Sequence, residues 1–176
     1  MQKIFLIGYM GSGKTTIGKC LAKRLNMQFI DLDTYIENKY RKSIVEIFAD
    51  KGEDGFRKIE KEMLQEIILF EDVVISTGGG CPCFFNNMEL MNNAGITIYL
   101  KMSVDELTKR LSGTSKEKRP LIKYKNANEL KSFIIDSLAK RDFFYSQAIY
   151  VYNAELSRKD ISYIVSDLIK TINGDT

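Results

Sequence analysis

The stretch GYMGSGKTT, residues 8–16, constrains this chain more than any other part of its sequence. It matches the pattern G-x-x-x-x-G-K-[ST] at Gly8, Gly13, Lys14 and Thr15. The apolar run KIFLI comes immediately before it, and apolar residues at helical spacing follow it. A chance glycine-rich turn is the alternative, but the order of strand, loop and helix favours a phosphate-binding loop.

Such a loop binds a nucleoside triphosphate mainly through its backbone. Small residues let successive N–H groups curl around phosphate oxygens, and the start of the following helix adds positive potential. Lys14 is expected to reach the terminal phosphates, and the Thr15 hydroxyl to bind Mg²⁺. The motif alone leaves open whether the chain is a kinase, a GTPase-type switch or a motor.

The rest of the sequence predicts a parallel sheet flanked by helices. Short apolar runs alternate with helical segments or turns: KIFLIG, QFIDL, VVIST, ITIYLK and AIYVYN. Ile4–Ile7 and Val73–Ile75 lack alternation and are expected to be central, because a strand covered on both faces is apolar throughout. Helices are predicted for Thr15–Leu25, SIVEIF, RKIEKEMLQEIILF, VDELTKRL, NELKSFIIDSLAKRDFFY and SRKDISYIVSDLIKTI, with Ser43 as an N-cap and Ser103 with Glu106 as a capping box.

A second glycine cluster follows the run VVIST. Gly78, Gly79 and Gly80 are adjacent, and fixing them is costly because glycine loses more backbone freedom than any other residue. A strand-to-helix turn is one explanation, although one glycine usually suffices for that. We therefore expect the triplet to offer backbone N–H groups to a hydroxyl or carboxylate, beside the same cleft as the phosphate-binding loop.

Asp31 and Asp33, in FIDLD, are placed at the C-terminal end of the second predicted strand. Open α/β sheets bind their ligands at this edge. Because side chains two apart on an extended segment share a side, one carboxylate can serve the metal and the other an acceptor hydroxyl. The alternative is that Asp33 is only the N-cap of a helix that begins at Thr34.

Three arginines are candidate anion ligands, because a guanidinium offers a planar fork to carboxylates and phosphates. Arg57 in GEDGFRKIE lies near the start of a predicted helix, and Arg141 in LAKRDFFY lies within one. Arg119 in KRPL belongs to the polar stretch 112–126, which we interpret as a lid over the transferring phosphoryl group. The alternative for each is a solvated charge.

Composition argues against several other functions. The 26 Lys plus Arg against 23 Asp plus Glu give a formal charge of +3, too small to indicate a nucleic acid or membrane partner. There is no histidine, so proton transfer must use a carboxylate, a lysine or water. Cys20, Cys81 and Cys83 suggest neither a disulfide framework nor a zinc site. Without a run of transmembrane length, we expect a single cytoplasmic domain, residues 1–176.

Together these motifs resemble the shikimate kinase family. The resemblance rests on GYMGSGKTT, DLD, GEDGFRKIE, STGGG, RPL and KRDFFY, which occur in this order between Gly8 and Tyr145. It implies a three-layer α/β/α fold with a five-stranded parallel sheet of order 2-3-1-4-5, that of a P-loop nucleoside-monophosphate kinase with a lid. It also implies a monomeric kinase that transfers the γ-phosphoryl group of ATP to the 3-hydroxyl of shikimate, in aromatic amino-acid biosynthesis.

The resemblance further implies roles for individual residues. ATP would be held by Gly11, Ser12, Gly13, Lys14, Thr15 and Thr16, with Arg119 approaching from the lid and Arg110 and Arg158 on the adenine side. Mg²⁺ would be positioned by Thr15 and Asp31, and the catalytic residues would be Lys14, Asp33 and Arg119. Shikimate would contact Asp33, Arg57, Gly78, Gly79, Gly80 and Arg141. Phe143 departs from the family, which commonly has proline there.

Two rival functions stay open on the sequence alone. One is a kinase for another small hydroxylated acceptor, such as gluconate or a nucleoside monophosphate, although the arginine pair and the triplet disfavour a nucleotide acceptor. The other is a nucleotide-binding switch without catalysis. That function is disfavoured because the sequence has no N-K-x-D motif for reading guanine.

Overall fold

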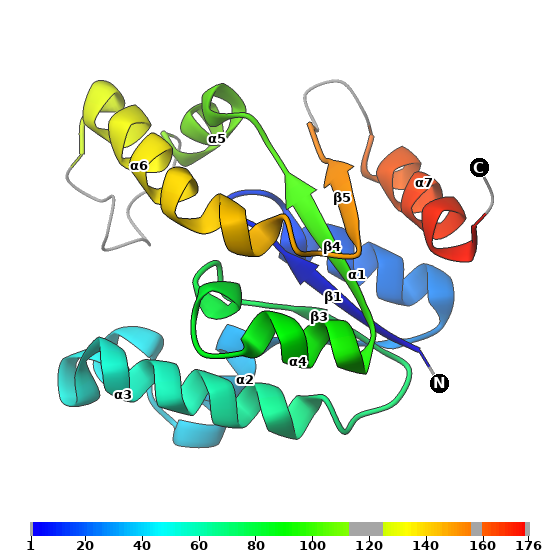
Figure 1. The fold of residues 1–176 in the computed structure, drawn as a ribbon, viewed down its shortest axis with the longest axis horizontal. Helices are drawn as coiled ribbons and strands as arrows, with labels where there is room; N and C mark the ends of the chain where they lie inside the picture. The colour runs from blue at the N-terminus through cyan, green and yellow to red at the C-terminus, as the bar shows by residue number, and fades with distance from the viewer. Residues whose placement is uncertain (1, 113–124, 156–159, 175–176) are drawn as a thin grey trace.

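The computed structural model describes residues 2–112, 125–155 and 160–174 as a parallel sheet with helices on both faces (Figure 1). Its strands are β1 (Lys3–Ile7), β2 (Gln28–Asp31), β3 (Val73–Ser76), β4 (Ile96–Lys101) and β5 (Tyr150–Asn153). They lie in the order β2-β3-β1-β4-β5, and every neighbouring pair is parallel. The expected three-layer fold and strand order are confirmed.

The helices divide between the two faces of the sheet. They are α1 (Lys14–Leu25), α2 (Leu32–Tyr40), α3 (Ile44–Ile67), α4 (Asn87–Ala94), α5 (Val104–Leu111), α6 (Ala127–Tyr145) and α7 (Ile161–Asn173), with a 3₁₀ turn, η1 (Cys81–Cys83). Buried side chains of α1, α5, α7 and the first half of α6 form one core cluster, and those of α2, α3, α4 and the end of α6 form the other. None of the helices within the described ranges is long and apolar enough to cross a bilayer.

Strand β1 is central and shows why its sequence lacks alternation. Ile4 and Leu6 point into one core cluster, and Phe5 and Ile7 point into the other. All four side chains are fully buried. A strand between two helical layers has no solvent face, so each of its positions must be apolar.

Helix α3 joins two segments that the sequence predicts separately. It begins after Ser43, whose side chain and that of Glu46 form a reciprocal capping box. At Gly52 the backbone leaves the helical region, with φ 66° and ψ −177°, and the helix kinks. Arg57 therefore lies near the start of the second segment, as expected.

Two predictions of local structure need correction. Ser103 caps α5 by accepting from the Glu106 N–H, but the Glu106 carboxylate pairs with Arg110 at 3.0 Å, so the capping box is only half formed. Helix α4 was not predicted, because its short sequence offers few apolar positions, among them Met88 and Met91, which are buried. The expected lid, 112–126, falls almost entirely outside the described residues.

Candidate active site

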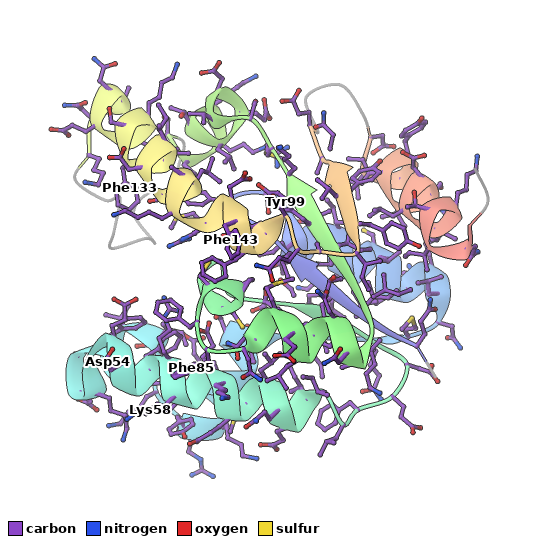
Figure 2. The ribbon with its side chains drawn as sticks, in the orientation of Figure 1. Asp54, Lys58, Phe85, Tyr99, Phe133 and Phe143 are labelled. Carbon is purple, nitrogen blue, oxygen red and sulfur yellow. The ribbon has the colours of Figure 1, made fainter. Side chains whose placement is uncertain are left out.

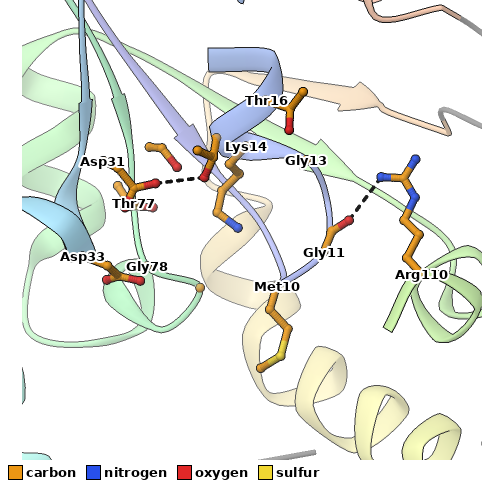
Figure 3. Close-up of a pocket in the computed structure, with 13 residues that line it drawn as sticks. Met10, Gly11, Gly13, Lys14, Thr16, Asp31, Asp33, Thr77, Gly78 and Arg110 are labelled. Carbon is orange, nitrogen blue, oxygen red and sulfur yellow. Dashed lines mark hydrogen bonds between the residues drawn. The ribbon is translucent and has the colours of Figure 1, made fainter. Parts of the chain in front are cut away.

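A cavity of about 480 Å³ lies where the phosphate-binding loop meets the carboxyl ends of β2 and β3 (Figure 3). It is lined by ten of the residues selected from the sequence: Gly11, Gly13, Lys14, Thr15, Thr16, Asp31, Asp33, Gly78, Gly79 and Arg110. Ser12 is fully buried within the loop. Segments far apart in the chain thus converge at the sheet edge where α/β folds bind their ligands.

The loop takes a backbone path that depends on glycine. Gly8, Gly11 and Gly13 have φ of 140°, 85° and 92°, a region that residues with a Cβ rarely adopt. The Lys14 ammonium donates to the carbonyl oxygens of Gly8, at 2.8 Å, and Tyr9, at 2.9 Å. These bonds hold the cation across the loop, at the N-terminus of α1.

Asp31 and Asp33 both reach the cavity, and Asp31 ends β2 with extended backbone as expected, but Asp33 does not lie on the strand. Asp31 is the N-cap of α2 and Asp33 lies in the first turn of that helix. The Asp31 carboxylate accepts from the Thr34 N–H at 3.4 Å and from the Thr15 hydroxyl at 2.9 Å. The predicted N-cap, Asp33, was therefore two residues too late. Strand β2 ends at Asp31, although the run QFIDL extends to Leu32.

Burial raises the pKa of Asp33 to about 6, and the negative charge of Asp31 adds to this. Lys14 and Arg57 oppose the shift without cancelling it. A carboxyl group of this kind is still mostly ionised at neutral pH, yet it is a stronger proton acceptor than an ordinary aspartate.

A second cavity, of about 400 Å³, adjoins the first and shares Met10, Asp33, Gly78 and Gly79 with it. Arg57 and Arg141 reach it from α3 and α6, two elements far apart in the sequence. The structure thus brings both predicted guanidinium groups to one pocket. Asp33 lies at the boundary between this pocket and the phosphate-binding loop.

The glycine triplet gives room to the charged side chains around it. A Cβ on Gly78 would lie 2.8 Å from an Asp33 carboxylate oxygen and 3.0 Å from one of Glu60. On Gly80 it would lie 2.6 Å from a terminal nitrogen of Arg57, and on Gly79 it would lie 3.4 Å from one of Arg141. Gly80 itself has an ordinary φ of −89°. Close approach therefore explains Gly78 and Gly80, whereas a Cβ on Gly79 would make only ordinary van der Waals contact, and none of the three has a positive φ.

Arg141 is held beside the middle glycine. Its guanidinium donates to the Gly79 carbonyl at 3.4 Å and lies 5.3 Å from the centre of the Tyr9 ring. The Tyr145 hydroxyl donates to the same carbonyl at 2.5 Å. Helix α6 continues past Phe143 without a break, and Phe143 is 73% exposed (Figure 2). The departure from proline therefore leaves Arg141 in the pocket.

Comparison with known proteins decides the family. The family model described as shikimate kinase matches residues 10–173. The shikimate kinase of Parabacteroides distasonis is 52% identical over 98% of this chain and all of its own length. The chain belongs to the shikimate kinase family. The shikimate kinase of Bacteroides thetaiotaomicron is also 52% identical, over 88% of each chain.

Solved shikimate kinases have the same fold as this family member. The crystal structure of the enzyme from Bacteroides thetaiotaomicron superimposes with a TM-score of 0.93 at 48% identity, over 98% of both chains. The enzyme from Acinetobacter baumannii, solved in complex with shikimate, gives a TM-score of 0.88 at 32% identity, over all of this chain and 95% of that one.

Besides Glu37, which lines the second cavity, sequence reasoning missed a buried charged residue of this site, Glu60. It is 1% exposed and accepts from Arg57 at 2.8 Å, while its other oxygen has no hydrogen-bond partner among the described residues. Burial raises the pKa of Glu60 to about 7, although Arg57 lowers it. Its position between the apolar Phe56 and Met63, at helical spacing, was a readable signal, because a charge on a buried face needs a partner.

Of the three arginines predicted on the nucleotide side, the structure describes Arg110. Arg110 donates to the Gly11 carbonyl at 3.2 Å and is tied to Glu106 by an ion pair, so it stands at the rim of the loop cavity (Figure 3). Arg119 and Arg158 lie outside the described residues.

Proposed function

We propose that this chain transfers the γ-phosphoryl group of ATP to the 3-hydroxyl of shikimate, giving shikimate 3-phosphate. The observation that carries this proposal is the position of Asp33 on the boundary between the phosphate-binding loop and a pocket containing two arginines. The complex of the Acinetobacter baumannii relative with shikimate supports the choice of acceptor. ATP is the co-substrate that a family of P-loop kinases requires.

Arg57 and Arg141 are proposed to hold the carboxylate of the acceptor. Two forked cations in one pocket favour a planar anion, because each can donate two parallel hydrogen bonds. Gly78, Gly79 and Gly80 line the same pocket, and a Cβ on Gly78 or Gly80 would crowd its charged groups. The pocket therefore suits a small acid better than a second nucleotide.

Asp33 is proposed to orient the acceptor hydroxyl and to take its proton. Phosphoryl transfer needs little covalent chemistry from the protein, so positioning and electrostatics account for most of the rate. Burial favours this function by raising the proton affinity of Asp33. Lys14, together with the backbone of residues 11–16, would stabilise the charge of the transferring group and its neighbours.

The Thr15 hydroxyl and the Asp31 carboxylate are proposed to hold Mg²⁺. Their oxygens lie 2.9 Å apart beside the loop, and hard oxygen ligands of this kind fit the ion (Figure 3). When bound, Mg²⁺ would neutralise phosphate charge. Asp31 could still cap α2 through its other oxygen, which accepts from Thr34.

The remaining features of the proposal come from the sequence. The chain would act as one P-loop kinase domain, residues 1–176, monomeric and in the cytoplasm, without nucleic acid or membrane partners. Residues 112–126 would form the lid, with Arg119 near the phosphates, and Arg110 and Arg158 would lie near the adenine. The small net charge of +3 is consistent with a small-molecule acceptor.

A coupled assay of ADP release with shikimate, quinate and gluconate, each with ATP and Mg²⁺, tests the proposal. We expect turnover with shikimate to exceed that with the other acceptors. Phosphate on the 3-hydroxyl of the product, located by NMR, would support the position of transfer. Preference for gluconate or for a nucleoside monophosphate would identify a different kinase, and turnover at background with every acceptor would indicate a switch.

A further inference from the structure

The Arg57 guanidinium is enclosed by aromatic rings from two parts of the chain. Its central carbon lies 4.1 Å from the centre of the Phe84 ring and 5.2 Å from that of Phe56. Phe48 is more distant, at 6.0 Å, and stacks on Phe56 with ring centres 4.4 Å apart. Phe48 and Phe56 belong to α3, like Arg57, whereas Phe84 follows η1. The closest ring is thus supplied by a different segment.

Gly80, four residues before Phe84, also lies close to the terminal nitrogens of Arg57. A Cβ on Gly80 would lie 2.6 and 2.8 Å from the two terminal nitrogens and 2.9 Å from the central carbon. All three atoms belong to the end of the guanidinium. Gly80 therefore lets the backbone after β3 approach this end of Arg57 more closely than a residue with a side chain could.

Hydrogen bonds hold the turn between Gly80 and Phe84 in place. The Cys83 N–H donates to the Gly80 carbonyl at 2.9 Å, and the Asn87 side chain donates to the Cys81 carbonyl at 2.9 Å. Pro82 restricts the backbone at the start of η1. The C-P-C sequence, which no part of the proposed reaction uses, thus fixes the Phe84 backbone relative to the glycine triplet.

Ion pairs alone leave the orientation of Arg57 incompletely fixed. One terminal nitrogen donates to the buried Glu60 at 2.8 Å, and the other donates to Glu53, which is 59% exposed, at 3.2 Å. The inner nitrogen, Nε, has no hydrogen-bond acceptor among the described residues. An exposed partner restrains a guanidinium weakly. An aromatic ring whose centre lies 4.1 Å from the central carbon restricts the motion that the ion pairs leave free.

We propose that Phe84 is a positioning residue for acceptor recognition: its ring holds the Arg57 guanidinium in the plane from which the fork meets the carboxylate of the acceptor. The inference rests on the proposed function, in which Arg57 binds that carboxylate. A guanidinium already oriented loses less side-chain freedom when the acceptor binds. Phe84 thus affects the affinity for the acid and leaves the phosphate-binding loop untouched.

Replacement of the ring tests this proposal. Phe84→Leu keeps an apolar side chain but removes the aromatic face, and we expect the KM for shikimate to rise about 5- to 30-fold, the range of a desolvated cation–π contact. The KM for ATP should change less than about twofold, because the loop is separate. Phe84→Tyr keeps the face and should restore a KM for shikimate close to that of the wild type. If the leucine variant does not fold, Phe84→Met gives the same comparison.

The neighbouring Phe85 supplies a matched control. Phe85 is 55% exposed (Figure 2), and the centre of its ring lies 5.0 Å from the Lys61 ammonium. Phe85→Leu should leave both KM values unchanged. Thermal unfolding of every variant separates a loss of packing from a loss of positioning. Equal falls in kcat for the leucine and tyrosine variants, or a lower melting temperature with unchanged KM for shikimate, would overturn the proposal.

A double-mutant cycle shows whether Phe84 acts through Arg57. In an Arg57→Lys background the planar group is absent, so Phe84→Leu should add less than about a twofold change in the KM for shikimate. Independent, multiplicative effects would contradict the proposal. Absence of shikimate turnover in the wild type would instead overturn the proposed function. Normal wild-type turnover with an unaltered KM in Phe84→Leu would overturn only the positioning role.

Discussion

Two glycine-rich segments meet at the active site, and they need glycine for different physical reasons. In the phosphate-binding loop, Gly8, Gly11 and Gly13 have positive φ, so glycine there supplies a backbone conformation. The triplet 78–80 has no such requirement, but charged side chains lie within 3.0 Å of the place that a Cβ on Gly78 or Gly80 would take. The same residue type thus provides conformation in one segment and space in the other.

The difference follows from how each side of the site is proposed to bind its ligand. The loop offers backbone N–H groups, which point correctly only if the chain follows one path. The acceptor pocket uses side chains of α2, α3 and α6, which must approach the backbone after β3. Substitutions should therefore separate nucleotide binding from acceptor binding, and the predictions below test that separation in order of expected effect.

Asp33→Ala should have the largest effect, because it removes the proposed proton acceptor while leaving the loop intact. We expect kcat to fall by about 10² to 10⁴-fold. The dissociation constant for ATP, measured by calorimetric titration, should change less than about threefold, since the loop binds phosphate through its backbone. The exposed Asp54 on α3 offers a matched control, because Asp54→Ala should leave kcat unchanged. If Asp33→Ala weakened ATP binding by as large a factor as it lowers kcat, nucleotide binding and acceptor binding would not be separable.

Gly8→Ala should destabilise the fold, because it combines an unfavourable φ with a collision against backbone. The new Cβ would lie 2.9 Å from the Leu100 carbonyl oxygen, which cannot rotate away. We expect the free energy of unfolding to fall by about 2–4 kcal/mol, together with ATP affinity. Urea denaturation and nucleotide titration measure the two losses.

Gly52 is a control for Gly8, because a residue with a Cβ there would have a strained backbone but would not collide with a neighbouring atom. It has φ 66°, and a Cβ there would have open space. Gly52→Ala should therefore cost about 1–3 kcal/mol of stability and leave ATP affinity unchanged. If it weakened ATP binding as much as Gly8→Ala does, local strain at the loop would not explain the nucleotide site.

Gly80→Ala should have a smaller effect, confined to the acceptor. The atoms that meet the new Cβ belong to the end of the Arg57 side chain, which can shift. We expect less than about 1 kcal/mol of lost stability but an increase of about tenfold in the KM for shikimate, smaller than the increase for Arg57→Ala. Steady-state kinetics at saturating ATP provide the measurement. An unchanged KM would contradict the idea that the triplet makes room for the clamp.

A change in pH should have an effect no larger than that of Gly80→Ala, and it should act on transfer rather than on nucleotide binding. Burial raises the pKa of Asp33 to about 6, so its ionised, proton-accepting form predominates at pH 7 and is lost as the pH falls through 6. We expect kcat to fall about tenfold between pH 7 and pH 5. Asp33→Asn should show a flat residual profile over that range. A wild-type profile as flat as that of the variant would remove Asp33 from the proton transfer.

The sequence by itself determined the phosphate-binding loop, the alternation of strands and helices, and the arginines and aspartates of the pocket. It could do so because motif spacing and apolar period are local properties of a chain. The strand order was available only through the family resemblance, since apolar period does not say which strands are neighbours. Helix α4 was missed because its sequence has too few apolar positions to show a period.

Tertiary structure alone decided how the charged groups are arranged. It placed Asp33 on a helix, buried Glu60 against Arg57, and brought Arg57 to Gly80 and Phe84, which follow it by more than twenty positions in the chain. Close approach between distant segments depends on how whole elements pack, and no local pattern encodes it. For that reason the sequence could point to three costly glycines, but only the fold showed that charged side chains fill the space beside Gly78 and Gly80.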